Sequence, residues 1–172
     1  STHSVLGEYW TRGLIGNDGK RIATLNFNMC DYDYPNVMGI RITEGTTIKK
    51  KGDLLVNKEL VRLMKWTDGA VGKSVSGVEG TIVGVFDDIR NRSFYSSQSP
   101  IVLIADKESA NHTINVRLKE PYDENLKRLN ECVAKTFPNV ALNFNSVDSM
   151  IREGYKSVYR FCLLYTSDAA DE

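Results

Sequence analysis

Apolar and polar residues alternate from Ala23 to Met29, and this period of two predicts a half-buried β-strand. Apolar runs at Leu54–Val56 and Ile101–Ala105 predict two further strands. A β-branched run lies within Ser74–Phe86 between turn-forming glycines, so a hairpin is expected there. The chain before residue 106 is therefore expected to consist mainly of strands and turns.

One short helix is expected to begin at Asn57 and to end before Thr67. The side chain of Asn57 can accept a hydrogen bond from a free N–H group at a helix N-terminus. Glu59 would then lie near the positive end of the helix dipole, which favours a carboxylate. The apolar stripe of this helix consists of Leu60, Leu63 and Met64.

After residue 113 the pattern predicts a strand, a helix and a strand. The alternating apolar positions are Ile114, Val116 and Leu118 in the first strand and Val140, Leu142 and Phe144 in the second. Between them, apolar residues recur at helical spacing at Leu126, Leu129, Val133 and Phe137. This order is typical of a right-handed βαβ unit. Ser146 can cap a final amphipathic helix that reaches Phe161.

The expected fold class is α+β, with two small lobes, mixed sheets with packed helices, and a C-terminal βαβ unit followed by a helix. A length of 172 residues allows one domain or two small lobes. The polar segment 91–100 is the expected crossing between the lobes. No apolar run approaches the length of about 18 residues that a membrane span requires.

The two ends of the chain carry a separate expectation. The chain begins at Ser1 without an initiator methionine, and its last segment, CLLYTSDAADE, resembles translated read-through of a sequencing adapter. We therefore expect residues 1–161 to be the native domain, incomplete at its N-terminus. Residues 162–172 are expected to be a non-native tail.

The charges exclude one class of partner. Lys plus Arg and Asp plus Glu number 22 each, and the longest basic run is Lys49–Lys51, so a nucleic-acid-binding surface is not expected. Cys30, Cys132 and Cys162 lack the paired spacing of a metal or redox site, and His3 and His112 are isolated. Cys30 and Cys132 could pair in an oxidising compartment, but a buried free thiol is the interpretation we favour.

No pattern in the sequence identifies a catalytic residue. Val71–Ser74 resembles the end of a phosphate-binding loop, but Thr67 stands where that motif requires a glycine. Gly77, Gly80 and Gly84 fit hairpin turns and a tightly packed strand better than a dinucleotide cradle. Asp87 and Asp88 are adjacent, so in a strand their side chains would point to opposite faces. Neither a catalytic residue, a cofactor nor a metal ion is therefore expected.

Several ordered segments together resemble one family. They are DYDYPNVMGIRITEG (31–45), LLVNKELVRLM (54–64), VGKSV (71–75), TIVGVFDDIR (81–90), SPIVL (99–103), INVRLK (114–119) and FPN (137–139). These segments resemble MacB-like periplasmic core domains of FtsX-type ABC-transporter permeases. The similarity spans about residues 25 to 161, whereas residues 1–20 match poorly and the family's usual first strand and helix are not evident.

The resemblance implies a non-catalytic domain at the periplasmic face of the bacterial inner membrane. Such a domain couples ATP-driven motion to export or to lipoprotein or peptide handling. The implied partners are an ABC ATPase acting through membrane helices absent from this chain, a permease dimer mate and a periplasmic adaptor protein. The residues carried over are structural, with Asn57 as a helix cap, Gly72 and Gly84 as backbone positions, and Asp87 as a turn residue.

The alternative function is a free-standing extracytoplasmic sensor or ligand-binding α+β domain. The neighbouring gene sequence distinguishes the two functions. A permease domain requires hydrophobic segments of about 20 residues on both sides, and a free-standing domain does not.

Overall fold

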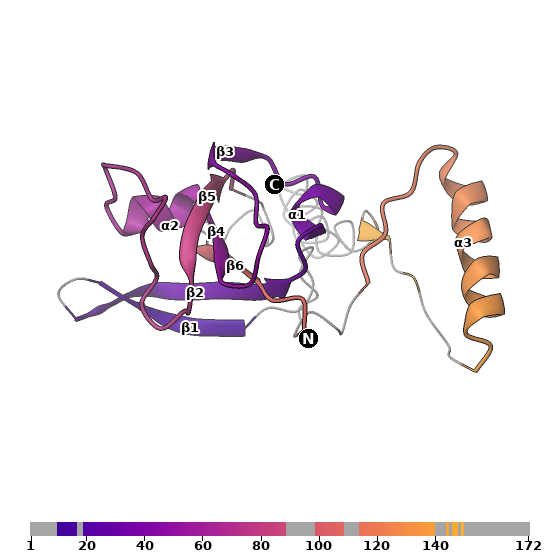
Figure 1. Cartoon of the computed structure of the whole chain (residues 1–172), viewed down its shortest axis with the longest axis horizontal. Helices are drawn as coiled ribbons and strands as arrows, with labels where there is room; N and C mark the ends of the chain where they lie inside the picture. The colour runs from indigo at the N-terminus through magenta and orange to yellow at the C-terminus, as the bar shows by residue number, and fades with distance from the viewer. Residues whose placement is uncertain are drawn as a thin grey trace, which may run out of the picture.

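The computed structural model describes residues 10–16, 19–88, 99–108 and 114–139, together with positions 144, 146, 147 and 149. Within these ranges the elements are, in chain order, β1 (Trp10–Ile15), β2 (Arg21–Cys30), α1 (Tyr34–Val37), β3 (Ile42–Gly45), β4 (Asp53–Asn57), α2 (Lys58–Leu63), β5 (Thr81–Phe86), β6 (Ile101–Ala105) and α3 (Tyr122–Thr136). Figure 1 shows α3 apart from the sheet that the strands form.

The strands form one mixed sheet in the order β1-β2-β6-β4-β5-β3. The pairs β2/β6 and β4/β5 are parallel, and the pairs β1/β2, β4/β6 and β3/β5 are antiparallel. Every residue of the central strand β4 is buried. Because a central strand with both faces covered needs apolar residues throughout, β4 has the run Leu54–Val56 in place of an alternating pattern.

A hydrophobic core lies on each face of the sheet. The first core contains the buried residues Leu14, Leu25, Leu54, Val56, Leu60, Ala70, Val75, Ile82, Val85 and Val102. The second contains Cys30, Tyr34, Ile48, Leu55, Phe86, Ile101, Leu103 and Ala105. Helix α2 supplies Leu60 to the first core, and the single turn of α1 supplies Tyr34 to the second. Consecutive residues of β4 therefore serve opposite cores, as the pleat of a strand requires.

The α+β class is confirmed, and so are most of the expected elements in this part of the chain. The strands predicted at Ala23–Met29 and Leu54–Val56 are β2 and β4, and both are longer than predicted. The strand predicted at Ile101–Ala105 is β6, with the same bounds. Helix α2 follows Asn57 directly and ends at Leu63. No helix in the described part of the chain is long and apolar enough to cross a membrane.

In the first hundred residues, one prediction is wrong and one strand has no clear sequence signal. The first arm of the hairpin predicted at Ser74–Phe86 is reduced to one isolated bridge between Val75 and Val78. The turn between Val75 and Val78 places Gly77 at a φ of 74°. The preceding residues Gly72 and Lys73 form two backbone hydrogen bonds with Ile82 of β5 but no regular strand. Strand β1 was not expected, and it owes its conformation to antiparallel pairing with β2 rather than to a clear alternation of its own.

The C-terminal βαβ unit differs from its prediction in its first strand. Helix α3 forms, but the described residues 114–119 form no strand, and the side chain of Ile114 is 79% exposed. Among the described residues no neighbouring strand accepts hydrogen bonds from this segment, and alternation alone does not make a strand. The second predicted strand apart from Phe144, most of the final helix, the tail at 162–172, and most of the segment 91–100 lie outside the described residues.

Leu54 in β4 and Leu129 in α3 differ in burial, so replacing each by alanine should destabilise the domain by different amounts. Leu54→Ala removes a fully buried side chain and should lower the free energy of unfolding by about 2–5 kcal/mol. Leu129 is half-buried in α3, which has no buried residue, so Leu129→Ala should cost about 1 kcal/mol or less. Urea unfolding of both variants measures the difference. Equal losses of unfolding free energy in the two variants would contradict the assignment of Leu54, and not Leu129, to the core.

Candidate functional site

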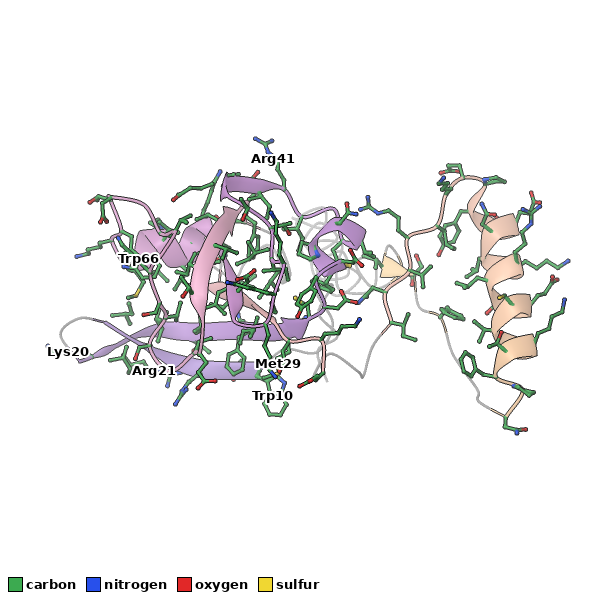
Figure 2. The ribbon with its side chains drawn as sticks, in the orientation of Figure 1. Trp10, Lys20, Arg21, Met29, Arg41 and Trp66 are labelled. Carbon is green, nitrogen blue, oxygen red and sulfur yellow. The ribbon has the colours of Figure 1, made fainter. Side chains whose placement is uncertain are left out.

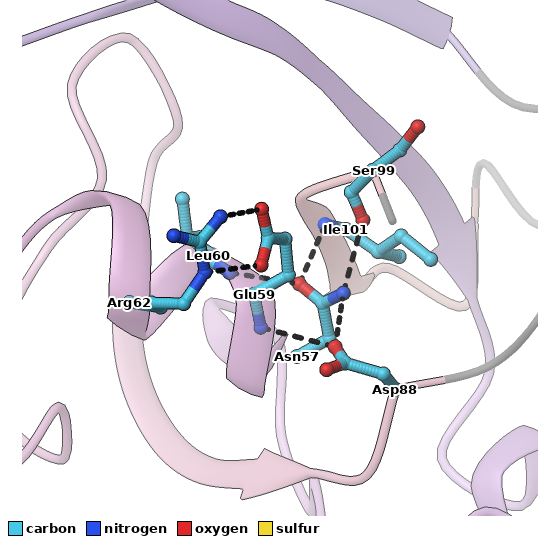
Figure 3. Close-up of polar contacts among 7 residues, drawn as sticks. All are labelled: Asn57, Glu59, Leu60, Arg62, Asp88, Ser99 and Ile101. Carbon is cyan, nitrogen blue, oxygen red and sulfur yellow. Dashed lines mark hydrogen bonds and ion pairs between the residues drawn. The ribbon is translucent and has the colours of Figure 1, made fainter. Parts of the chain in front are cut away.

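The carboxyl end of β4 carries a buried polar cluster around Asn57. Asn57 is both the last residue of β4 and the N-cap of α2, and its side chain is inaccessible to solvent. Its amide contacts groups of Leu60, Asp88, Ser99 and Ile101 (Figure 3). We call this set of five residues the Asn57 junction. It joins the end of β4, the start of α2, the residues after β5 and the start of β6.

The amide of Asn57 uses all of its hydrogen-bonding capacity. Its Oδ1 accepts from the backbone N–H groups of Leu60 at 3.2 Å and Ile101 at 2.8 Å. Its Nδ2 donates to Asp88 Oδ1 at 2.8 Å and to the Ser99 carbonyl at 3.0 Å. An amide has two donors and an oxygen that can accept twice, which matches these four partners. Aspartate cannot donate to Ser99 or Asp88, so asparagine is the side chain that this environment requires.

Asp88 extends the junction to the first turn of α2. The same Oδ1 atom of Asp88 also accepts from the backbone N–H of Glu59 at 3.0 Å. A carboxylate at this position satisfies a free N–H group of the helix and interacts favourably with the helix dipole. Glu59 in turn accepts from Arg62 at 2.6 and 2.7 Å through both carboxylate oxygens. The residues that follow β5 are therefore fastened to α2 by side-chain contacts.

Asp87 lies beside this junction but faces solvent. Its carboxylate accepts from Lys58 Nζ at 2.5 Å and forms an ion pair with Arg41 at 3.4 Å. The hydrogen bond from Lys58 holds the pKa of Asp87 below its ordinary value, with the charges of Lys58 and Arg41 acting in the same direction. Asp87 thus links Lys58, at the start of α2, to Arg41, the residue before β3. The sequence suggested a turn role for Asp87, and the structure adds these two cationic partners.

Gly72 and Gly84 occupy two different backbone environments. The Gly72 N–H donates to the Ile82 carbonyl at 2.8 Å, and the Lys73 N–H donates to the Ala70 carbonyl at 3.1 Å. The N–H groups that a phosphate-binding loop would offer are thus bound to carbonyl groups. At Gly84, an added Cβ would lie 2.3 Å from the Thr46 carbonyl oxygen. Only glycine therefore allows the backbone at Thr46 to approach β5 this closely.

The remaining candidate groups do not converge on one place. Cys30 is a buried free thiol whose pKa is raised to about 12, first by burial and then by the charge of Asp31. Cys132 is free and exposed on α3, so the two thiols are not paired. No group of three metal-ligating side chains occurs among the described residues. His3 and His112 lie outside those residues.

The sequence identifies Asn57 as a helix cap but does not identify its distant partners Asp88, Ser99 and Ile101. A polar residue directly after a buried strand was the available signal for Asp88. The identity of its partner depends on β6 and β5 both flanking β4, and the strand order is not encoded in any local pattern.

Comparison with solved structures finds this fold in the periplasmic region of a MacB protein. No family model and no curated protein matches the chain. The periplasmic region of MacB from Actinobacillus actinomycetemcomitans is similar, with a TM-score of 0.54, 12% identity, and coverage of 86% of this chain and 74% of that one. A domain of a permease protein from Porphyromonas gingivalis is also similar, with a TM-score of 0.46, 21% identity, and coverage of 84% and 78%. The chain therefore has a MacB-like periplasmic domain fold, as the sequence segments indicated.

The full use of the Asn57 amide predicts a large and specific cost of substitution. Asn57→Ala should lower the free energy of unfolding by about 3 kcal/mol, because buried partners lose their hydrogen bonds. Asn57→Asp places a second carboxyl group beside Asp88, and the raised pKa of such a pair makes the variant least destabilised at low pH. Chemical unfolding at several pH values measures both effects. Asn36→Ala, at an exposed position, is the control. A loss of unfolding free energy in Asn57→Ala as small as that in Asn36→Ala would contradict the role of the junction.

The lowered pKa of Asp87 predicts a separate dependence on pH. A carboxyl group with a depressed folded-state pKa contributes stability above its ordinary pKa of 3.8, and this contribution is lost as the pH falls through the lowered value. Asp87→Asn should therefore reduce the Tm at neutral pH, and the difference from the parent chain should close below pH 3.8. Asp33→Asn is the control, since Asp33 forms no ion pair within the described residues. A difference that persists unchanged in strong acid would exclude the ion pairs as its cause.

Proposed function

We propose that this chain is an extracytoplasmic domain of an ABC-transporter permease, which couples ATP-driven motion to export through protein contacts. The observation that carries the proposal is the likeness of its fold to the periplasmic region of MacB over 86% of the chain. On this proposal the domain performs no chemistry. The ATPase acts on it indirectly through membrane helices, and its direct partners are a permease dimer mate and a periplasmic adaptor protein.

The arrangement of the junction supports a mechanical role. Asn57 binds the residues after β5 and the start of β6 to β4, and Asp88 binds the same region to α2. Displacement of α2 is therefore transmitted to three neighbouring strand ends without a flexible connection. Buried polar networks whose groups are all satisfied are rigid, which is the property that a coupling element needs.

The occupied backbone around Gly72 supports the placement of the ATPase elsewhere. Lys73 is bound by Asp68 and lies over the ring of Trp66 at 5.5 Å, so its ammonium group already has partners. The backbone donors at Gly72 and Lys73 are bound to Ile82 and Ala70. A nucleotide could bind there only by breaking these contacts. The hydrolysis that drives the proposed motion is therefore assigned to another domain or chain.

The coupling proposal predicts that a flexible insertion uncouples the complete permease. A Gly-Gly pair inserted after Tyr155 should abolish export while ATP hydrolysis continues, because transmission to the membrane requires a stiff connection. Export is measured as the phenotype that deletion of the permease gene removes. The control is the same insertion beside Gly19, where an added Cβ would contact no atom within 4 Å. Normal export by the Tyr155 insertion variant would contradict coupling through this domain.

A further inference from the structure

In the sheet that the described residues form, the two edge strands, β1 and β3, differ in how they are protected from pairing with another strand. The β3 edge has four residues, and its register with β5 shifts between Ile42 and Glu44. The β1 edge has six residues, and its register with β2 is regular from Trp10 to Leu14. Figure 1 shows β1 along the outer side of the sheet. Bulges, shortness and charged side chains are the usual means by which an edge strand avoids pairing with another chain.

Arg12 is the one charged residue of β1, and it does not block the pairing of another strand at the β1 edge. Arg12 Nη1 donates to the Gly77 carbonyl at 2.6 Å, so the side chain is turned toward the loop that covers the first core. Arg21, from β2, donates to Thr24, and its Cδ lies 3.4 Å from the position of a Cβ at Gly13. Arg21 therefore lies over Gly13 of β1. Neither arginine forms an ion pair within the described residues.

The charge at this edge contrasts with the balanced charge of the whole chain. The β1–β2 hairpin sequence, residues 10–30, contains Arg12, Lys20 and Arg21 against a single carboxyl group, Asp18. Trp10 and Ile15, at the two ends of β1, are 67% and 42% exposed. Figure 2 shows Trp10, Arg21 and Lys20 on this hairpin. The edge thus combines strand hydrogen-bonding groups, apolar ends and an excess of positive charge.

We infer that the β1 edge receives an extended, acidic segment of a partner protein, which adds to the sheet as a further strand. Backbone hydrogen bonds would supply affinity, and carboxylates facing Arg21 would supply specificity. A second copy of this chain fits less well, because antiparallel β1–β1 pairing brings the arginines of both copies together. The inference concerns the contact surface of the domain and does not depend on ATP-driven coupling.

The test uses the 172-residue chain and a capped seven-residue peptide in which glutamate alternates with valine. Titration followed by NMR should shift the backbone amides of Trp10–Ile15 and the indole of Trp10. Two matched peptides are the controls, one with lysine for each glutamate and one with a central proline, which cannot complete a strand. The acidic peptide should bind at least about tenfold more tightly than either control. Arg21→Gln should weaken its binding, and added salt should do the same.

Four outcomes would overturn the inference. The first is no shift in β1 at millimolar concentrations of the acidic peptide, and the second is equal binding of the lysine peptide. The third is a set of shifts confined to residues away from β1. The fourth is sedimentation of the free chain as a dimer whose β1 amides are protected from exchange, which would assign the edge to a second copy. The export assay plays no part in these outcomes, so failure of the coupling proposal would be recognised separately.

Discussion

The amide of Asn57 is the interaction on which the arrangement of the sheet depends. Its four hydrogen bonds satisfy buried groups from the start of α2, the residues after β5 and the start of β6. A buried polar group without a partner costs about 1–3 kcal/mol, and a domain of this size is stable by only about 5–15 kcal/mol. The loss of several partners at once would therefore remove a large share of the total stability. This one side chain therefore connects the carboxyl end of β4 with the residues after β5 and with the start of β6.

The local elements of the fold could be predicted from the sequence where a physical signal was strong. Alternation identified β2, apolar runs identified β4 and β6, and the capping chemistry of Asn57 identified the start of α2. The signals failed where conformation depends on a partner. Strand β1 has a glycine at position 13 and little alternation, and it exists because β2 pairs with it. Residues 114–119 alternate well but have no strand partner among the described residues.

The candidate site shows the same division between local and distant information. The cap formed by Asn57 and Leu60 is local, because the two partners are three positions apart, and it could be expected from residue type. The bonds from Asn57 to Asp88 and Ile101 span 31 and 44 residues and depend on the strand order. The positions of Arg12 and Arg21 at the β1 edge also became apparent only with the fold. Distant contacts of this kind give the domain its rigidity and its proposed contact surface, and no local pattern specifies them.

The central claim is that this domain lies outside the cytoplasm, and its cysteines allow that claim to be measured directly. Cys132 is exposed, whereas Cys30 is buried with a raised pKa and should not react. In cells that express the complete gene, a thiol reagent that cannot cross the inner membrane should label Cys132 before lysis. Cys132→Ser should abolish the signal. Labelling that appears only after the inner membrane is broken would place the domain in the cytoplasm and contradict the account.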